Sequence, residues 1–142
     1  MVEFALVLPL LLTIVLGVID FGKAMNYWID QTHLANEGAR WAVVNRNPGA
    51  GAGDSLQAYL QNSADSAELR TSSEVCVDFP DGTSGVGDAV RLKMKIDYNW
   101  LPWFPNWLPS WGTTTTIRGD ATMRLEAVPT NYSVADNIGT CA

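Results

Sequence analysis

Residues 1–25 read MVEFALVLPLLLTIVLGVIDFGKAM, and this stretch decides the fold class. No charged residue occurs between Glu3 and Asp20. The uncharged run of about 16 residues would span about 24 Å as a helix, slightly less than the ~30 Å hydrocarbon core of a bilayer. The run begins with an acid and lacks the small-residue cleavage site of a secretory signal. We therefore expect a retained, membrane-length helix.

The helical pattern continues beyond Asp20 to about Asn45. It is carried by apolar and small residues at helical spacing, namely Phe21, Ala24, Trp28, Ala35, Ala39 and Ala42. Helix-ending residues follow at Asn47-Pro48-Gly49, which predicts one helix of about 45 residues and about 68 Å. Pro9 is expected to kink or loosen the first turns. The small residues, together with Gly38, favour close packing of the outer half on its own domain.

The rest of the chain predicts a small mixed domain. Residues 55–70 fit one short amphipathic helix with Asp54 or Ser55 as its N-cap. Strand-like stretches follow at residues 74–79, 86–98 and 114–127, and in the second of them Val90, Leu92, Met94 and Ile96 alternate with charged residues. We expect an α+β fold, in which a long N-terminal hydrophobic helix (residues 1–46) precedes a head domain (residues 47–142) with a short helix and a small antiparallel β-sheet.

Composition and motifs exclude several classes of function. The net charge is −6 and no Lys/Arg cluster occurs, so we expect no nucleic-acid partner. His33 is the only histidine and has no partner at catalytic spacing, and no common catalytic or phosphate-binding motif appears, so we expect no catalytic residue, no cofactor and no enzyme. Asp78, Asp81 and Asp88 lie in a Gly-rich stretch, but they fail the EF-hand spacing, and we favour a solvated turn without metal.

Two further features suggest covalent chemistry. Cys76 and Cys141 fit no CxxC pattern, and an even count in an exported chain favours a disulfide that closes a loop of about 65 residues. Two unlinked buried thiols are the alternative. Asn131-Tyr132-Ser133 matches the N-glycosylation acceptor pattern.

An aromatic connection lies between the last two strand-like stretches. Residues 99–112 read NWLPWFPNWLPSWG and contain Trp100, Trp103, Phe104, Trp107 and Trp111. Prolines prevent a regular strand here, and the rings must be buried against something. A lid over the open end of the sheet, a subunit-contact or adhesive patch, and a carbohydrate-stacking surface are the three alternatives.

Four segments together resemble the TadE-like branch of the type IV pilin superfamily. These are VEFALVLPLLLTIVLGVIDFGKAM, ANEGARWAV, GDAVRLKMKIDY and GDATMRLE. The resemblance implies a prepilin that is held in the inner membrane, is cut by a prepilin peptidase, and is assembled by pilus machinery with a cytoplasmic ATPase into a homopolymeric filament at the cell surface. Its filament core would consist of Phe4, Leu8, Pro9, Leu11, Val15 and Val18.

The resemblance also gives Glu3 a role, in which its carboxylate pairs with the free amine of a neighbouring subunit during docking. In the family this glutamate is usually the fifth residue after cleavage and follows a basic leader ending in glycine. Here it is third, so either the leader and first residues lie outside this sequence or processing differs. A simpler explanation of Glu3 is a favourable interaction with the helix dipole at the first turn.

We therefore expect a non-enzymatic pilin subunit with a membrane-anchored precursor. The alternative is a minor pilin, a pseudopilin or a membrane-anchored assembly factor that primes such a filament. An anchored sugar-binding or hydrolytic domain is the alternative from another class.

Overall fold

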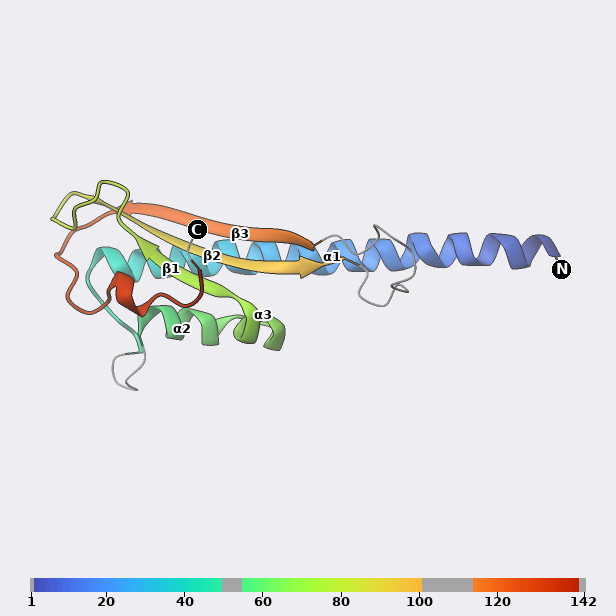
Figure 1. Cartoon of the computed structure of the whole chain (residues 1–142), viewed down its shortest axis with the longest axis horizontal. Coiled ribbons are helices and arrows are strands. Elements are labelled where there is room, and N and C mark those ends of the chain that lie inside the picture. Colours follow the sequence, from blue (N-terminus) through green and yellow to red (C-terminus); the bar gives the residue numbers. More distant parts are fainter. Residues whose placement is uncertain (1, 50–54, 101–113, 141–142) are drawn as a thin grey trace.

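The computed structural model describes residues 2–49, 55–100 and 114–140, without the side chains of residues 2, 3, 5 and 6. One long helix, α1 (Val2–Val43), runs along the whole molecule, and its N-terminal half projects beyond a head formed by all other elements (Figure 1). The head contains short helices and a three-stranded antiparallel sheet. The predicted α+β fold with a long N-terminal apolar helix is confirmed.

Helix α1 ends slightly before the predicted position. Asn45 adopts a left-handed conformation with φ of 51°. Its N–H donates to Ala42 O at 3.0 Å, and the next N–H, of Arg46, donates to Trp41 O at 2.9 Å. This pair of bonds is a Schellman motif, which satisfies carbonyls that the last turn would otherwise leave unpaired. Asn45 therefore ends the helix, ahead of the Asn-Pro-Gly sequence that we expected to end it.

Pro9 does not interrupt α1, which is helical from Val2 to Val43. The carbonyl oxygen of Pro9 accepts the hydroxyl of Thr13 at 2.8 Å. Pro9 is the eighth residue of α1 and lies beyond the first four positions, whose N–H groups lack a helical partner, so the proline removes one backbone hydrogen bond from α1.

The predicted helix over residues 55–70 is two helices, α2 (Leu56–Ser63) and α3 (Ala67–Ser72). Ser55 caps α2 by accepting the N–H of Ala58 at 3.1 Å, as one of the two predicted N-caps. Between the helices Ala64 is extended, and its carbonyl accepts Arg70 Nε at 2.7 Å. The break allows α3 to turn back toward α1, where it contributes to the site described below.

The sheet contains β1 (Glu74–Asp78), β2 (Ala89–Asn99) and β3 (Thr114–Arg124) in that order, with antiparallel neighbours. The predicted alternation in β2 is confirmed, since Val90, Leu92, Met94 and Ile96 are all buried. The opposite face carries charges that pair across the strands. The Asp78 carboxylate lies 2.6 Å from the Arg91 guanidinium and 3.0 Å from Lys93 Nζ. The Glu74 carboxylate lies 3.1 Å from Lys95 Nζ.

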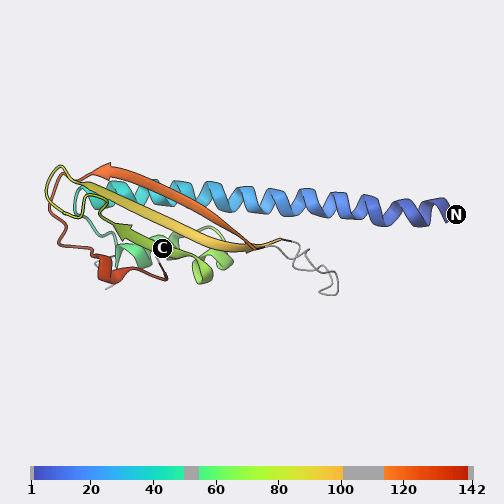
Figure 2. The ribbon, with the colours of Figure 1, turned by 45° about the horizontal axis from the view of Figure 1, so that its top comes forward.

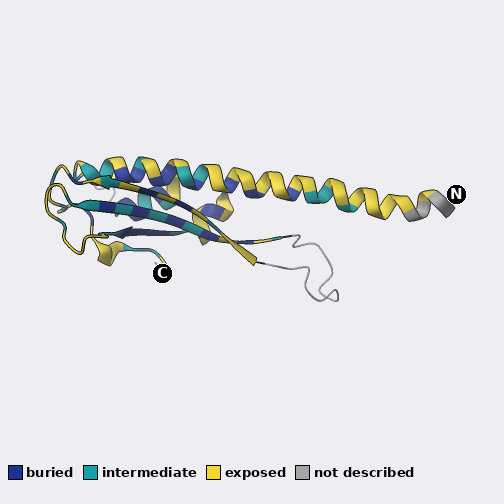
Figure 3. Ribbon diagram, turned by 90° about the horizontal axis from the view of Figure 1, so that it is seen from above, coloured by how far each residue is buried: buried dark blue, intermediate teal, exposed yellow. Residues whose placement is uncertain are grey.

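The outer half of α1 packs along the buried face of the sheet, while its N-terminal half has no such cover (Figures 2 and 3). Two glycines allow this close packing. A Cβ at Gly119 of β3 would lie 2.6 Å from the backbone of Gln31, and a Cβ at Gly38 would lie 2.4 Å from the Leu60 side chain. Both glycines belong to segments that carried the family resemblance. Ala35, Ala39 and Ala42 are completely buried, as their small size predicted.

The C-terminal tail covers the free edge of β1. Val75 and Ile138 exchange backbone hydrogen bonds of 3.0 and 2.9 Å, just after the 3-10 helix η2 (Val134–Asp136). Asn137 accepts the N–H of Val77 at 2.8 Å through its side chain. A covered edge cannot pair with a strand of another chain, so this side of the sheet is closed to edge-to-edge association.

Candidate functional site: the apolar arm and its junction with the head

The arm, defined here as residues 4–19 of α1, is apolar and exposed on all its sides. The large exposed side chains are Phe4, Val7, Leu8, Leu10, Leu11, Leu12, Ile14, Val15, Val18 and Ile19. Pro9 is exposed as well, so every residue predicted for the filament core lies on this uncovered surface. Phe4 and Val18 keep 70 % and 67 % of their surface exposed. The described residues of the head leave the arm bare, and another apolar phase must cover it.

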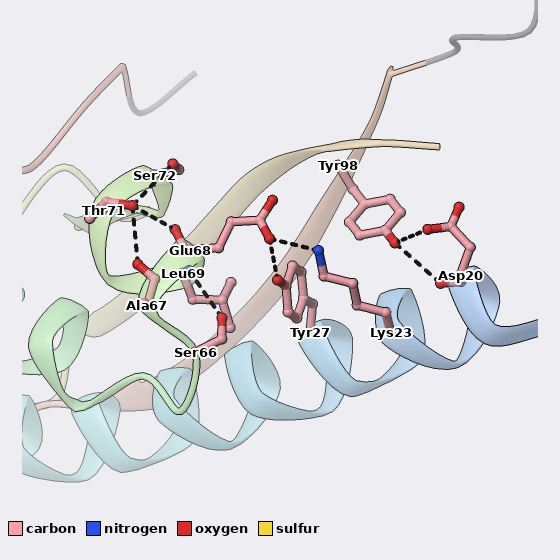
Figure 4. Close-up of polar contacts among 10 residues, drawn as sticks. All are labelled: Asp20, Lys23, Tyr27, Ser66, Ala67, Glu68, Leu69, Thr71, Ser72 and Tyr98. Carbon is pink, nitrogen blue, oxygen red and sulfur yellow. Dashed lines mark hydrogen bonds and ion pairs between the residues drawn. The ribbon is translucent and has the colours of Figure 1, made fainter. Parts of the chain in front are cut away.

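A buried acid marks the point where the arm meets the head. Asp20 is only 8 % exposed, and the Tyr98 hydroxyl donates to its carboxylate at 2.5 Å and to its backbone oxygen at 3.2 Å (Figure 4). Burial, followed by the nearby Asp20 carboxylate, raises the pKa of Tyr98. Tyr98 therefore stays protonated and donates to Asp20 at any physiological pH. This contact fixes the end of β2 to α1 one residue after the arm ends.

A second polar contact joins α3 to α1 at the same level. Glu68 accepts Lys23 Nζ at 2.7 Å and the Tyr27 hydroxyl at 2.5 Å (Figure 4). The hydrogen bonds from Lys23 and then Tyr27 hold the pKa of Glu68 below its usual value. Because Lys23 and Glu68 are about half exposed, the pair positions α3 more than it stabilises the fold.

Aromatic rings extend this junction toward the arm. Trp100 stacks on Phe21 with ring centroids 6.5 Å apart and meets Tyr98 edge-on at 5.1 Å. Its indole N–H donates to Thr115 Oγ1 at 2.7 Å. Trp103, Phe104, Trp107 and Trp111 lie outside the described residues, and the predicted contact role of the aromatic connection stays a prediction.

Glu3 lies in the first turn of α1, but its side chain is outside the described part of the structure. Cys76 is buried on β1, and its Sγ lies 4.0 Å from the carbonyl oxygen of Ile138. Cys141 is not among the described residues, so the Cys76–Cys141 bond stays a prediction. Asn131 is exposed, and its Nδ2, the atom to which a glycan would be attached, donates to Asn45 O at 2.6 Å.

The acids of the Gly-rich stretch have separate local roles. Asp81 accepts the N–H of Ala89 at 2.9 Å, and Asp88 accepts the N–H of Gly85 at 2.7 Å. Asp78 pairs with the cations of β2. Across residues 2–49, 55–100 and 114–140, no group of three or more His, Cys, Asp or Glu is placed to hold a metal ion.

Sequence reasoning missed the junction contacts. Asp20 was treated only as the end of the uncharged run, and no role was predicted for Lys23. A signal was available, because the alternation of β2 extends to Tyr98 and places its ring on the buried face, directed at α1. A lone acid at the end of an apolar helix and a tyrosine at the end of an apolar strand face indicate such a pair.

Comparison with known proteins identifies the long helix as the matched part of the chain. A family model described as TadE-like protein matches residues 1–40, which cover the arm and most of α1. No curated protein and no solved structure is significantly similar to the chain. Within the described residues one helix is long and apolar enough to cross a membrane, and only 11 % of its most apolar window, of mean hydropathy 1.9, is buried in the chain. These observations support membrane anchoring through the arm. The predicted resemblance to the TadE-like family is confirmed over residues 1–40.

Proposed function

We propose that the chain is a structural subunit of a Tad-type pilus filament, in which the arms of many copies pack side by side as the core. The observation that carries this proposal is the arm itself, which is apolar on every side and continues without a break into the head. In the membrane precursor lipid covers the arm. In the filament the arms of neighbouring subunits replace the lipid, so its apolar surface stays out of water in both states.

The arm also has a feature that favours helix packing over lipid alone. Thr13 and Gly17 are four residues apart, and nothing lies within 4 Å of a Cβ built at Gly17. Small residues at this spacing let two helix backbones approach closely. An anchor that only needs to stay in lipid has no such requirement.

Glu3 would act in the exchange from lipid to filament. A carboxylate near the start of an apolar helix is costly unless it is paired. Pairing with the free amine of the neighbouring chain would remove this cost and would set the axial register between subunits. We expect Glu3→Gln to keep membrane insertion and to lower filament yield. Filaments at wild-type yield would contradict the docking role.

The filament role is tested by shearing filaments from source cells and identifying their principal subunit by electron microscopy and mass spectrometry. This chain should dominate the sheared material. If it is present only at a few copies per filament, it is a minor pilin or pseudopilin, and if it stays with the cell envelope, it is a membrane-anchored assembly factor.

A variant separates packing from anchoring. Gly17→Leu increases the apolar surface of the arm, so retention in the membrane should be unchanged, but the larger side chain blocks close approach of a second helix. We expect loss of filaments with normal membrane retention. Val15→Leu, which adds one methylene group to the exposed side chain four residues after Leu11, is the matched control and should still assemble. Normal filaments from Gly17→Leu would contradict close arm packing at this position.

A further inference from the structure

Beyond the arm, apolar exposure continues on one face of α1 only. The outer stripe, as we call it, consists of Phe21, Met25, Trp28 and Ile29, which follow each other at helical spacing. Their exposed fractions are 57 %, 39 %, 49 % and 59 %. Two of them, Phe21 and Trp28, were expected to share the face of the buried alanines. The head instead buries Tyr27 and Gln31 at this level, and its described residues leave the stripe exposed.

We propose that the outer stripe, together with Trp100, lies on the headgroup region of the membrane leaflet in the anchored protein, so that the head leans on the bilayer through one face of α1. The proposal rests on anchoring through the arm. It concerns a different surface and the stage before assembly, so it goes beyond the filament role.

The length of the apolar surface fits this arrangement. The arm is about 24 Å long, which falls short of the ~30 Å hydrocarbon core. From Phe4 to Ile29 the helix is about 39 Å long, close to the 40–45 Å of a bilayer with its headgroups. The length of the arm, which is apolar on all sides, therefore matches most of the hydrocarbon core. The stretch that carries the outer stripe, which is apolar on one side, matches the rest of the core and the headgroup region. The stretch from Phe4 to Ile29 is longer than the hydrocarbon core, and tilting is one way in which a helix accommodates such an excess.

Two charged residues at this level, Asp20 and Lys23, do not oppose the contact. Asp20 and Lys23 would stop a membrane span if they faced lipid. Asp20 instead accepts the hydroxyl of Tyr98, and Lys23 reaches Glu68 of α3, both on the side of α1 that carries the head (Figure 4). The head thus removes these two charged groups from the stripe side.

The chemistry of the stripe is typical of a membrane interface. Tryptophan prefers the headgroup level, where its ring is buried and its N–H is satisfied. Trp28 projects from the middle of the stripe, and Trp100 stacks on Phe21 while its N–H is held by Thr115. The neighbouring residues of β3, Thr114 to Thr116, are exposed and uncharged. A second copy of the chain could also cover an apolar face, but the continuity of this face with the arm favours lipid.

Brominated-lipid quenching tests the contact on the full chain in nanodiscs that hold one chain each. Trp28→Phe removes an emitter that we place at the lipid. Trp41→Phe is the matched control, since Trp41 lies on the same helix about 20 Å further from the arm. Compared with the unchanged chain, Trp28→Phe should lower the quenched fraction of tryptophan emission, whereas Trp41→Phe should raise it. Circular dichroism of each variant checks that the fold is kept.

If Trp28→Phe raises the quenched fraction as Trp41→Phe does, the contact is wrong although the anchor holds. If acrylamide reaches Trp28 in these single-chain discs but not in discs that hold two cross-linked chains, a second copy covers the stripe and the proposal is overturned. A chain that an alkaline wash removes from the discs would overturn both anchoring and this contact. If the variants give the expected changes in quenching but the unchanged chain forms no filaments in cells, only the filament role is contradicted.

Discussion

Gln31 lies in the middle of the buried face of α1 and is completely enclosed. Neither atom of its side-chain amide has a hydrogen-bond partner among the described residues. Gln57 is also fully buried, but its Nε2 donates to Ser133 O at 2.8 Å and to Asn137 Oδ1 at 3.2 Å. The Gln57 side-chain oxygen lacks a partner as well, so Gln57 is satisfied in part and Gln31 not at all. An enclosed amide without partners is costly because it loses its hydrogen bonds to water.

We expect Gln31→Met to raise the free energy of unfolding of the head by about 1–2 kcal/mol, since a side chain of similar shape removes the unpaired amide. Gln57→Met should lower it by about 1–3 kcal/mol, since it leaves the oxygens of Ser133 and Asn137 with fewer donors. Urea unfolding of the full chain in detergent, followed by near-ultraviolet circular dichroism, measures both. Destabilisation by Gln31→Met would mean that the amide has a partner in solution.

Acid should weaken the head. Lys23 and Tyr27 hold the pKa of Glu68 below its ordinary 4.5. Burial raises the pKa of Asp78, but hydrogen bonds from Arg91 and Lys93 outweigh it and hold the value below 3.8. Because both folded pKa values lie below the unfolded ones, this stabilisation is present above about pH 4.5 and is lost as pH falls through the folded values. Urea midpoints should stay level from pH 7 to 5 and then decrease. A Glu68→Gln, Asp78→Asn variant with an equally steep decrease would contradict this cause.

Residue-level burial was only partly predictable. Ala35, Ala39 and Ala42 were placed correctly because small residues at helical spacing indicate a tight contact. Phe21 and Trp28 fit the same spacing, but Gly119 brings the backbone of β3 against α1 at Gln31, where a tryptophan ring has no room. The direction from which the sheet approaches the helix is a tertiary property, and the helical pattern of α1 alone does not contain it.

At the scale of elements, the packing of β3 across α1 depends on one glycine. A Cβ at Gly119 would lie 2.6 Å from backbone atoms of Gln31 and Thr32, which cannot move aside as a side chain tip can. Secondary structure around it followed from alternation and periodicity, and the strands begin and end within a few residues of the prediction. The break between α2 and α3 was missed, because it depends on Arg70 binding the carbonyl of Ala64.

We expect Gly119→Ala to lower the unfolding free energy by about 1–3 kcal/mol through overpacking. Gly22→Ala is the matched control, since nothing lies within 4 Å of its Cβ and alanine favours helix, so it should be neutral or slightly stabilising. Thermal unfolding of both variants in the same detergent measures the difference. Equal melting temperatures would show that β3 can move away from α1 at little cost.

The tail and β1 give the disulfide prediction its structural setting. Ile138 pairs with Val75, next to Cys76, and position 141 follows three residues later. We expect peptide mapping without reductant to recover a Cys76–Cys141 crosslink, and reduction to lower stability by about 2–4 kcal/mol. Cys76→Ala alone serves as control, since reduction should then change nothing. Two free thiols in the mature protein would contradict the bond.

At the scale of the whole molecule, arm and head divide at Asp20. Every residue of α1 that is fully buried within the described chain lies at or after this position. The apolar helix of the arm could be predicted from sequence, because an uncharged run of this length indicates such a helix without knowledge of the tertiary structure. The burial of Asp20 against Tyr98 and the pairing of Lys23 with Glu68 could not be predicted in this way, because they need β2 and α3 in place.

Deletion of residues 1–19 should therefore give a soluble, folded head. We expect a monomer by size-exclusion chromatography, with a urea midpoint close to that of the full chain. Acrylamide quenching of its tryptophans, compared with that in filaments, also tests whether assembly covers Trp103 or Trp107. Equal quenching in both states would mean that the aromatic connection is only a lid, and an aggregated or unfolded head would show that the core extends into the arm.

The Schellman end of α1 at Asn45 and the absence of any break before it have a mechanical consequence. A pull on the head along the long axis reaches the arm through one continuous helix. No hinge or linker can extend first under this load. To release the head, the tension must slide the helix past the sheet, and the close fits at Gly38 and Gly119 resist that sliding in shear along their whole overlap. A chain of this shape transmits such a pull as a rigid rod.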